Sequence, residues 1–556
     1  MTKRDDSMPT NLSRRHFLGA AGAAAGGVAL GATGLAACAP PTEPSKGTPW
    51  DHEFDVVVIG SGTGLVAALA ARVAGAEVVV LEKRKIVGGT TGHSGGVAWI
   101  PNNNVMKKEG LADDPEKART YLTKLAGGQA TPELIEAFLA AGPEMVDFVE
   151  AHSPLRWRVS TILGNNADYH PEWPGAMTRG RSLEPITDRQ GLYGPELIAG
   201  IQKGYEDAGG QLWTETPARR LIVKHHDENR REIVGVEAIR DGKPIRIRAR
   251  RGVHLASGGF EWDFELKQHF LRAPTLYTLG AGGNTGDGLR MAMAVGADLR
   301  NMNEVYGHTV YKAEAEALRP NNMGATLNAE IEKRVAGSII VNDRGERFHD
   351  EAADYDSTWR SFYTWENWGD LRYRNLPAFA IFDGSIRKKG KLAGASASDP
   401  LPEWFVEAPT LRELATRLGI DPDGLEATVA RWNENARKGV DPEFERGKSH
   451  YDRYGSEDVS ITLGPIAEAP FYGAEVAAAD LGTCGGARVD GKAQVLDPFG
   501  EVIPGLSASG NCAGIGSPGS SYGGGGGTIG PALTFAFIAG RELGAKTSGS
   551  GTGEKA

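Results

Sequence analysis

The first candidate binding feature of the sequence is a turn made of glycine and hydroxyl residues. Residues 54–59 (FDVVVI) are an apolar run, and the turn follows at once as Gly60, Ser61, Gly62, Thr63 and Gly64. Glycines let a backbone approach a pyrophosphate closely, and the amides at the start of a following helix stabilise its charge. Glu82, 22 residues after Gly60, could accept hydrogen bonds from ribose hydroxyls. The turn predicts a dinucleotide site, although its glycines are spaced GxGxG instead of GxGxxG.

A second loop of the same composition favours FAD over NAD. It begins soon after the ribose carboxylate, which suits a cofactor whose ribityl chain and ring continue past the pyrophosphate and need amide and hydroxyl donors. The candidate residues of this region are Lys83, Gly88, Gly89, Thr90, Thr91, Ser94, Gly95 and Gly96. Near the C-terminus, Asn511 follows a serine-glycine step, and Thr528 and Ile529 open an apolar helix whose positive end could face the flavin. Non-covalent FAD is expected, because no cysteine or histidine stands in a recognisable flavin-linkage motif.

The elements that must position these residues are typical of an α/β fold. Residues 54–59 are β-branched and apolar, as in a buried parallel strand. Residues 65–75 (LVAALAARVAG) predict a helix, and residues 77–81 (EVVVL) predict a second strand that ends beside Glu82. Residues 533–543 (LTFAFIAGREL) predict the C-terminal helix. The first strand, the helix and the second strand together form a Rossmann-type strand–turn–helix–strand unit.

Composition excludes several classes of protein. The formal net charge of −10 over 556 residues provides no basic surface for nucleic acid. The three cysteines, Cys38, Cys484 and Cys512, include no CxxC pair, so neither a zinc site nor a dithiol centre is expected. His225 and His226 lie in a charged stretch that reads as a solvated loop, so no metal site is predicted.

The N-terminal sequence is typical of an export signal. Arg14 and Arg15 precede an Ala/Gly-rich stretch, residues 17–37, that is too weakly apolar for a convincing membrane span. Paired arginines in this position resemble a twin-arginine (Tat) signal, which exports folded proteins. Cys38 follows Leu-Ala-Ala, which resembles a lipoprotein cleavage box, so we expect a periplasmic or outer-face location with a possible lipid tether at Cys38. Ordinary cleavage without lipidation is the alternative.

Seven segments together resemble the 3-ketosteroid Δ1-dehydrogenase branch of the fumarate reductase/flavocytochrome flavoprotein superfamily, over residues 53–545. They are SGGVAWIPNN (94–103), ADYHPEWPG (167–175), ASGGFEWD (256–263), GGNTGDG (282–288), SIIVNDRGERFHDEAADY (338–355), GVDPEFERGKSHYDRYG (439–455) and SYGGGGGTIGPALTF (521–535). Within them the resemblance adds Gly258, Asn284 and Asp287 to the expected cofactor residues.

The resemblance implies a Rossmann-type FAD-binding domain with a parallel sheet, built from both chain ends, and an inserted α+β catalytic domain. The predicted parts are a signal peptide (1–37), a proline-rich tether (38–50), the FAD-binding domain (51–290 and 479–548), the catalytic domain (291–478) and a disordered tail (549–556).

The resemblance also implies the reaction and the residues that serve it. Desaturating a ring next to its ketone needs a carbonyl clamp, a base for the α-proton and a hydride acceptor. By motif position, Tyr522 and the backbone N–H of Gly526 would bind the carbonyl, Tyr355 would be the base, and Tyr169 would support it. Flavin N5 would accept the hydride. The expected substrate is a small apolar cyclic ketone, first of all a 3-ketosteroid.

Two departures from the family pattern affect the expected substrate. His170 stands where a second tyrosine is common, and residues 523–527 are five glycines where tyrosine-proline-glycine is usual. These changes predict a reshaped ketone-binding end and a looser loop.

Three other functions remain open at this stage. One is desaturation of another alicyclic or terpenoid ketone. Another is a fumarate-type reductase, disfavoured because the position eight residues after Arg347 holds Tyr355 instead of arginine, and no arginine stands between Arg488 and Arg541. The third is a non-catalytic, flavin-bearing lipoprotein. No haem motif or iron–sulfur spacing occurs, so electrons should leave to a quinone, a redox protein or oxygen.

Overall fold

The computed structural model describes residues 49–162, 167–189, 191–226, 231–519 and 521–546. The predicted export signal, Cys38 and the C-terminal tail lie outside the described residues, as does the tether up to residue 48.

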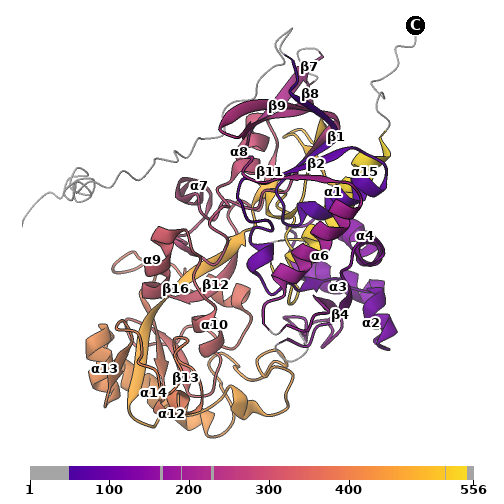
Figure 1. Ribbon diagram of the computed structural model, residues 1–556. Coiled ribbons are helices and arrows are strands. Elements are labelled where there is room, and N and C mark those ends of the chain that lie inside the picture. The colour runs from indigo at the N-terminus through magenta and orange to yellow at the C-terminus, as the bar shows by residue number, and fades with distance from the viewer. Residues whose placement is uncertain (1–48, 163–166, 190, 227–230, 520, 547–556) are drawn as a thin grey trace, which may run out of the picture. The chain divides into compact units, whose positions relative to one another are not determined.

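An eight-stranded sheet contains the dinucleotide motif (Figure 1). Its main order is β18 (Gln494–Leu496), β19 (Val502–Ala508), β9 (Lys243–Leu255), β1 (His52–Ile59), β2 (Val78–Leu81) and β6 (Gln211–Trp213), and β8 (Arg231–Arg240) joins β9 to β7 (Ala218–His225). Strands β19, β9, β1, β2 and β6 pair in parallel. The predicted α/β class with a parallel sheet is confirmed, and segments from both ends of the chain build that sheet.

Helices cover this sheet because its central strands are apolar on both sides. Val56, Val57 and Val58 of β1 are fully buried. Helices α1 (Gly64–Val73) and α15 (Ile529–Ala545) contact each other, and α4 (Pro132–His152) and α6 (Gly194–Asp207) contact them in turn (Figure 1). The C-terminal helix begins four residues before the apolar run that predicted it, so Ile529 is its first residue.

A six-stranded sheet forms the second core. Its order is β10 (Tyr277–Thr278), β16 (Phe471–Thr483), β14 (Ala378–Phe382) and β13 (Ser338–Asn342), with β12 (Val305–Tyr311) and β15 (Val406–Ala408) also paired to β16. All of its pairings except β10–β16 are antiparallel. Strand β10 and the end of β16 lie outside residues 291–478, the segment assigned to the insert.

Shorter elements connect the two sheets. Strands β3 (Ala98–Trp99), β5 (Ser182–Pro185) and β4 (Trp157–Val159) form a small sheet, and β11 (Leu299–Arg300) pairs with β17 (Gly486–Ala487). The remaining α-helices are α2 (Asn104–Lys108), α3 (Pro115–Ala126), α7 (Phe264–Phe270), α8 (Asp287–Ala294), α9 (Lys312–Leu318), α10 (Asn328–Glu332), α11 (Tyr355–Ser361), α12 (Gly384–Lys389), α13 (Leu411–Leu418) and α14 (Pro422–Ala436).

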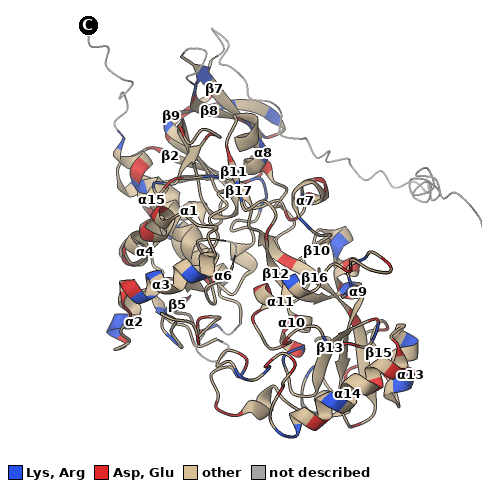
Figure 2. Ribbon diagram, turned by 180° about the vertical axis from the view of Figure 1, so that it is seen from behind, with Lys and Arg blue, Asp and Glu red and all other residues tan. Residues whose placement is uncertain are grey.

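Charge lies mainly on the outer elements. Figure 2 shows both signs of charge on α13 and α14, whose opposite sides bury Leu414 and Leu425 against the second core. Among the described residues, no helix combines the length and the apolar character that crossing a membrane requires.

Candidate active site

A cavity of about 820 Å³ is lined by both glycine loops, by the start of α15 and by strands of the second sheet. All the predicted site residues except Gly64 line it. The cofactor candidates are Gly60, Ser61, Gly62, Thr63, Glu82, Lys83, Gly88, Gly89, Thr90, Thr91, Ser94, Gly95, Gly96, Gly258, Asn284, Asp287, Asn511, Thr528 and Ile529, and the catalytic candidates are Tyr169, Tyr355, Tyr522 and Gly526. Residues far apart in sequence therefore share one site.

The first glycine turn is shaped by close backbone packing. Gly60 has a φ of +106°, and a Cβ there would lie 2.2 Å from the carbonyl oxygen of Ala256, so only glycine fits. The Glu82 carboxylate accepts hydrogen bonds from the Ser61 hydroxyl at 2.5 Å and from the Arg84 N–H at 2.8 Å. Gly64 does not line the cavity. A Cβ there would lie 2.8 Å from that of Ala256, so this glycine serves the packing of α1 on the sheet.

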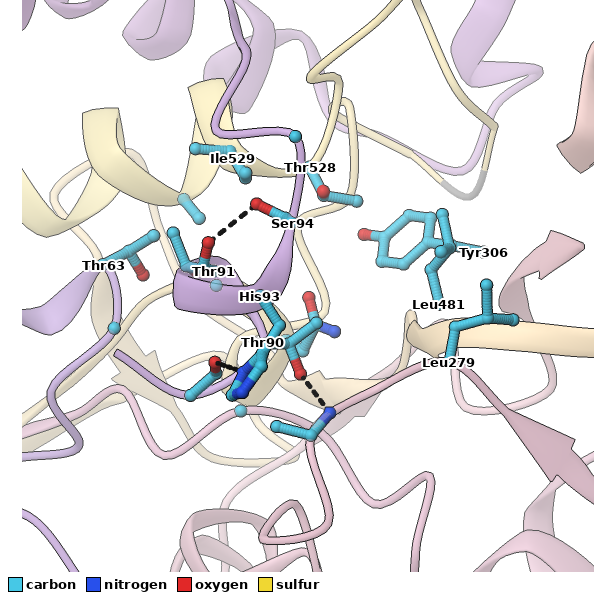
Figure 3. A pocket seen from close by; sticks show the side chains of 18 of the residues that line it. Thr63, Thr90, Thr91, His93, Ser94, Leu279, Tyr306, Leu481, Thr528 and Ile529 are labelled. Atoms are coloured by element: carbon cyan, nitrogen blue, oxygen red, sulfur yellow. Dashed lines mark hydrogen bonds between the residues drawn. The ribbon is translucent and has the colours of Figure 1, made fainter. Parts of the chain in front are cut away.

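The second loop is held to the segment around Asn284. The Thr90 hydroxyl accepts hydrogen bonds from the Asn284 amide and the Ala281 N–H, both at 2.9 Å. The Ser94 hydroxyl donates to the carbonyl of Thr91 at 2.7 Å. Figure 3 shows these hydroxyl residues near Thr528 and Ile529 at the start of α15, with Tyr306, Leu279 and Leu481 across the cavity. The site thus has a polar side and an apolar side.

Two predicted cofactor residues bind each other. Lys83 donates to the carboxylate of Asp287 at 2.7 Å and to the Thr285 hydroxyl at 2.8 Å. The pair joins the end of β2 to the start of α8, at the edge of the cavity. It positions the chain around Glu82.

The predicted catalytic tyrosines meet as one cluster. The Tyr169 hydroxyl donates a hydrogen bond to the Tyr355 hydroxyl at 2.7 Å. The Tyr522 ring lies 5.1 Å from that of Tyr355 and 5.7 Å from that of Tyr169, between ring centres. The Tyr522 hydroxyl lies 2.9 Å from Thr528 Oγ1. The three phenols therefore come from three separate segments to one face of the cavity.

A buried ion pair positions Tyr169 beside the glycine run. The carboxylate of Asp168 accepts hydrogen bonds from Arg181 Nη1, Trp99 Nε1 and the Met177 N–H, all at 2.8 Å. The N–H of Tyr169 then donates to the carbonyl of Gly523 at 3.2 Å. This backbone contact brings Tyr169 next to Tyr522.

The predicted looseness of the glycine run is wrong. The carbonyls of Gly523, Gly525 and Gly526 accept hydrogen bonds from Tyr121, Ser182 and Trp99, at 2.7, 2.8 and 3.1 Å. The loop lies directly on Trp99, which a Cβ at residue 524 would approach to 2.7 Å. Gly526 has a φ of +91°, and its N–H donates to no described residue, so it is free to bind a ligand oxygen.

Burial raises the pKa of all three phenols. Loss of hydration, followed by repulsion among the tyrosines, raises the pKa of Tyr355 and of Tyr169 well above the ordinary value. Loss of hydration raises the pKa of Tyr522 to about 12. Tyr522 is thus a hydrogen-bond donor at neutral pH, and Tyr355 must lose its proton against a raised pKa before it can act as a base.

Sequence reasoning missed part of the cavity wall. This part of the wall consists of Tyr306 and His308 from β12, Arg334 from the turn after α10, and Tyr451 from the segment before residue 455. Tyr451 lies in a segment that carries the family resemblance, but no pattern marked its contact with Tyr169. The expected effect of His170 on the ketone-binding end is not supported, because its ring stacks on Trp173 at 4.1 Å and does not line the cavity.

The FAD-binding domain family matches residues 55–528. The chain belongs to this flavoprotein family. It is 36% identical to the 3-oxosteroid 1-dehydrogenase of Mycobacterium tuberculosis, over 88% of this chain and 98% of that one. It is 34% identical to the 4-oxocyclohexanecarboxylate 2-dehydrogenase of Sinomonas cyclohexanicum, over 92% and 96%. The 3-ketosteroid Δ1-dehydrogenase of Sterolibacterium denitrificans, solved with 1,4-androstadiene-3,17-dione, superimposes with a TM-score of 0.80 at 28% identity, over 89% and 100%.

The cofactor is FAD, and the protein is an oxidoreductase acting on CH–CH groups. The residues present fit that cofactor, since one cavity joins the glycine turn, where only glycine fits at residue 60, the carboxylate of Glu82 and a hydroxyl-lined loop. Membership of this enzyme family also argues against the non-catalytic alternative. The reductase alternative finds no support at position 355, where an arginine was required and where a tyrosine lines the cavity.

FAD should be released when the purified yellow protein is precipitated with acid. The cavity is formed by hydrogen-bonding groups, and the two described cysteines are buried, with no flavin-linkage motif around them. The supernatant should therefore contain the yellow flavin absorbance. Flavin that remains in the pellet would contradict non-covalent binding.

Proposed function

We propose that this protein desaturates a ring ketone next to its carbonyl, with a 3-ketosteroid as the first-choice substrate and Δ1-dehydrogenation as the reaction. The cluster of Tyr169, Tyr355 and Tyr522 beside the FAD-binding loops carries this proposal. The relatives named as 3-oxosteroid 1-dehydrogenases support the choice of ketone.

The chain's own residues bind the ketone and move one proton. The Tyr522 phenol and the free N–H of Gly526 bind the carbonyl oxygen, which gains negative charge as the α-carbon loses its proton. Tyr355 takes that proton, and Tyr169 is its hydrogen-bond partner at 2.7 Å. Bound FAD supplies a hydride acceptor for the neighbouring carbon. Tyr306, Leu279 and Leu481 provide an apolar wall for the ring system.

A smaller alicyclic ketone is the second candidate. The 4-oxocyclohexanecarboxylate 2-dehydrogenase is nearly as similar to this chain as the steroid enzymes are, at 34% against 36% identity. The same tyrosines would serve a single ring equally well. An experiment must therefore decide whether the substrate is a steroid or a single-ring ketone.

A screen of the purified flavoprotein tests the proposal. With an artificial electron acceptor, 4-androstene-3,17-dione should be oxidised to the 1,4-diene, and cyclohexanones and fumarate serve as comparisons. Turnover of cyclohexanones alone would favour the second candidate. Reduction of fumarate without oxidation of any ketone would contradict both. The physiological acceptor, proposed to be a quinone, a redox protein or oxygen, can be compared in the same assay.

We propose further that the protein is exported through the Tat pathway and tethered at Cys38. Replacing Arg14 and Arg15 by lysine should leave the folded, flavinated enzyme in the cytoplasm, because the pathway reads the paired arginines. Cys38→Ala should leave it exported but soluble in the periplasmic fraction. Fractionation followed by immunoblotting measures both, and unchanged fractionation of both variants would contradict this assignment.

A further inference from the structure

Four arginine side chains are buried in the described part of the chain, and one of them lacks the partner that the others have. The other three each contact a carboxylate at 3.0 Å or less: Arg181 with Asp113 and Asp168, Arg347 with Glu351 and Asp441, and Arg446 with Glu351. Arg334 is 4% exposed, and no carboxylate oxygen of a described residue lies within 4.0 Å of its guanidinium.

The contacts of Arg334 are with neutral groups. Its Nη1 and Nη2 donate to the hydroxyl and the carbonyl of Tyr451 at 3.3 and 3.0 Å, and its buried Nε has no hydrogen-bond partner among the described residues. The guanidinium lies over the rings of Tyr451 and Tyr454, 4.5 and 4.3 Å from their centres. Arginine keeps its charge in proteins, so a positive charge is buried here with no carboxylate in direct contact, although the charge of Glu330 acts on it from farther away.

Arg334 belongs to the wall of the active-site cavity. It stands in the turn between α10 and β13. The ring of Tyr451 separates it from the reacting tyrosines, since one side of that ring faces Arg334 and its centre lies 4.8 Å from the ring centre of Tyr169. On the same segment, Glu330 also lines the cavity, contacts Lys333 at 3.0 Å and accepts the Thr309 N–H. Asp452 accepts the N–H groups of Gly447 and Ser449. Neither carboxylate lies within 4.0 Å of the Arg334 guanidinium, although each interacts with its charge at longer range.

We infer that Arg334 binds a carboxylate of the substrate, so that the natural substrate is a ring ketone that also carries an acid group. A substrate carboxylate would be the direct ion-pair partner that Arg334 lacks, and it would accept hydrogen bonds from the planar guanidinium in matched geometry. The ketone would lie at Tyr522 and Gly526, and the acid would point to Arg334. This inference rests on the proposed desaturation. It applies to a single ring or to a steroid with an acidic side chain.

Matched acid and ester substrates test the inference. Anaerobic reduction of the enzyme's flavin is measured for 4-oxocyclohexanecarboxylate and its methyl ester, and for 3-oxochol-4-en-24-oate and its methyl ester. In at least one pair the wild type should prefer the acid by at least about tenfold in kcat/KM, the range expected for hydrogen bonds to a charged group. Arg334→Gln should lower kcat/KM for that acid about 10- to 100-fold and leave its ester within about threefold. Arg334→Lys should restore part of the preference.

A binding measurement and a matched variant separate charge recognition from general damage. Cyclohexanecarboxylate has no ketone to activate its ring for dehydrogenation, so the change in flavin absorbance that it causes reports binding alone, and Arg334→Gln should weaken that binding. Arg240→Gln is the control, because Arg240 also lies over an aromatic ring, that of Trp213 at 3.8 Å, but does not line the cavity. Its acid-to-ester ratio should equal that of the wild type.

Two results would overturn the inference while leaving the desaturation intact. One is a wild type that reduces its flavin with the esters as efficiently as with both acids. The other is an Arg334→Gln variant that loses acid and ester in equal proportion. Failure of every ketone, acid or ester, to reduce the flavin would instead contradict the proposed function itself.

Discussion

Replacing Tyr355 by phenylalanine should slow reduction of the flavin by the ketone by at least about 10²-fold, the loss typical of a missing general base. The substitution removes only the hydroxyl that receives the Tyr169 hydrogen bond at 2.7 Å and keeps the ring that packs against Tyr522 and His308. Binding of the ketone should change little, because the carbonyl clamp remains. Stopped-flow bleaching of the flavin under anaerobic conditions measures both the rate and its saturation with substrate.

The pH dependence of that rate distinguishes a base from a packing residue. Burial raises the pKa of Tyr355 above its ordinary value, so its phenolate fraction increases with pH throughout the accessible range below that pKa. The wild-type rate of flavin reduction should therefore rise with pH, and Tyr355→Phe should lose that rise. Tyr363→Phe is the matched control, because its hydroxyl contacts Thr275 at 3.1 Å and does not line the cavity. A Tyr355→Phe variant with wild-type rate and pH profile would contradict the assignment.

Replacing Tyr522 by phenylalanine should slow flavin reduction by about 10²- to 10³-fold, as when one donor is removed from an oxyanion hole. The pKa of Tyr522, raised to about 12 by burial, keeps its hydroxyl protonated and able to donate at neutral pH. Unlike Tyr355→Phe, this change should also weaken binding of phenolic analogues, whose oxygen occupies the position of the enolate oxygen. Titration of the flavin absorbance with such a phenol measures the difference.

Tyr306→Phe is the comparison for Tyr522→Phe. Tyr306 lines the same cavity, its ring lies edge-on to that of Tyr522 at 5.3 Å, and its hydroxyl bonds to Cys484. Removing the Tyr306 hydroxyl should therefore slow flavin reduction by less than about tenfold, a smaller effect than that of Tyr522→Phe. Equal effects of the two substitutions would mean that the cluster acts through packing, and the role of Tyr522 as carbonyl clamp would be wrong.

The local parts of the site could be predicted from the sequence. The glycine turn, the flanking strand and helix, and Glu82 lie within one short stretch whose periodicity and backbone demands are local, and the structure places them as expected. The tyrosines were reached through motif resemblance, and all three line the cavity. The local pattern did not show that neighbouring glycines have different roles. Gly60 shapes the turn, whereas Gly64 lets helix α1 approach the sheet.

By itself, the sequence determined the α/β class and the dinucleotide turn, because these depend on spacing within a segment, and its resemblance to a known family supplied the candidate tyrosines. Only the tertiary structure decided which segments meet. Tyr169 reaches Tyr522 through a backbone hydrogen bond to residue 523, and that glycine run packs directly on Trp99. Arg334 has no local signal, since a buried arginine is recognised as unpaired only when the carboxylates of every neighbouring segment are in place. The stacking of His170 on Trp173, by contrast, is a contact within one segment.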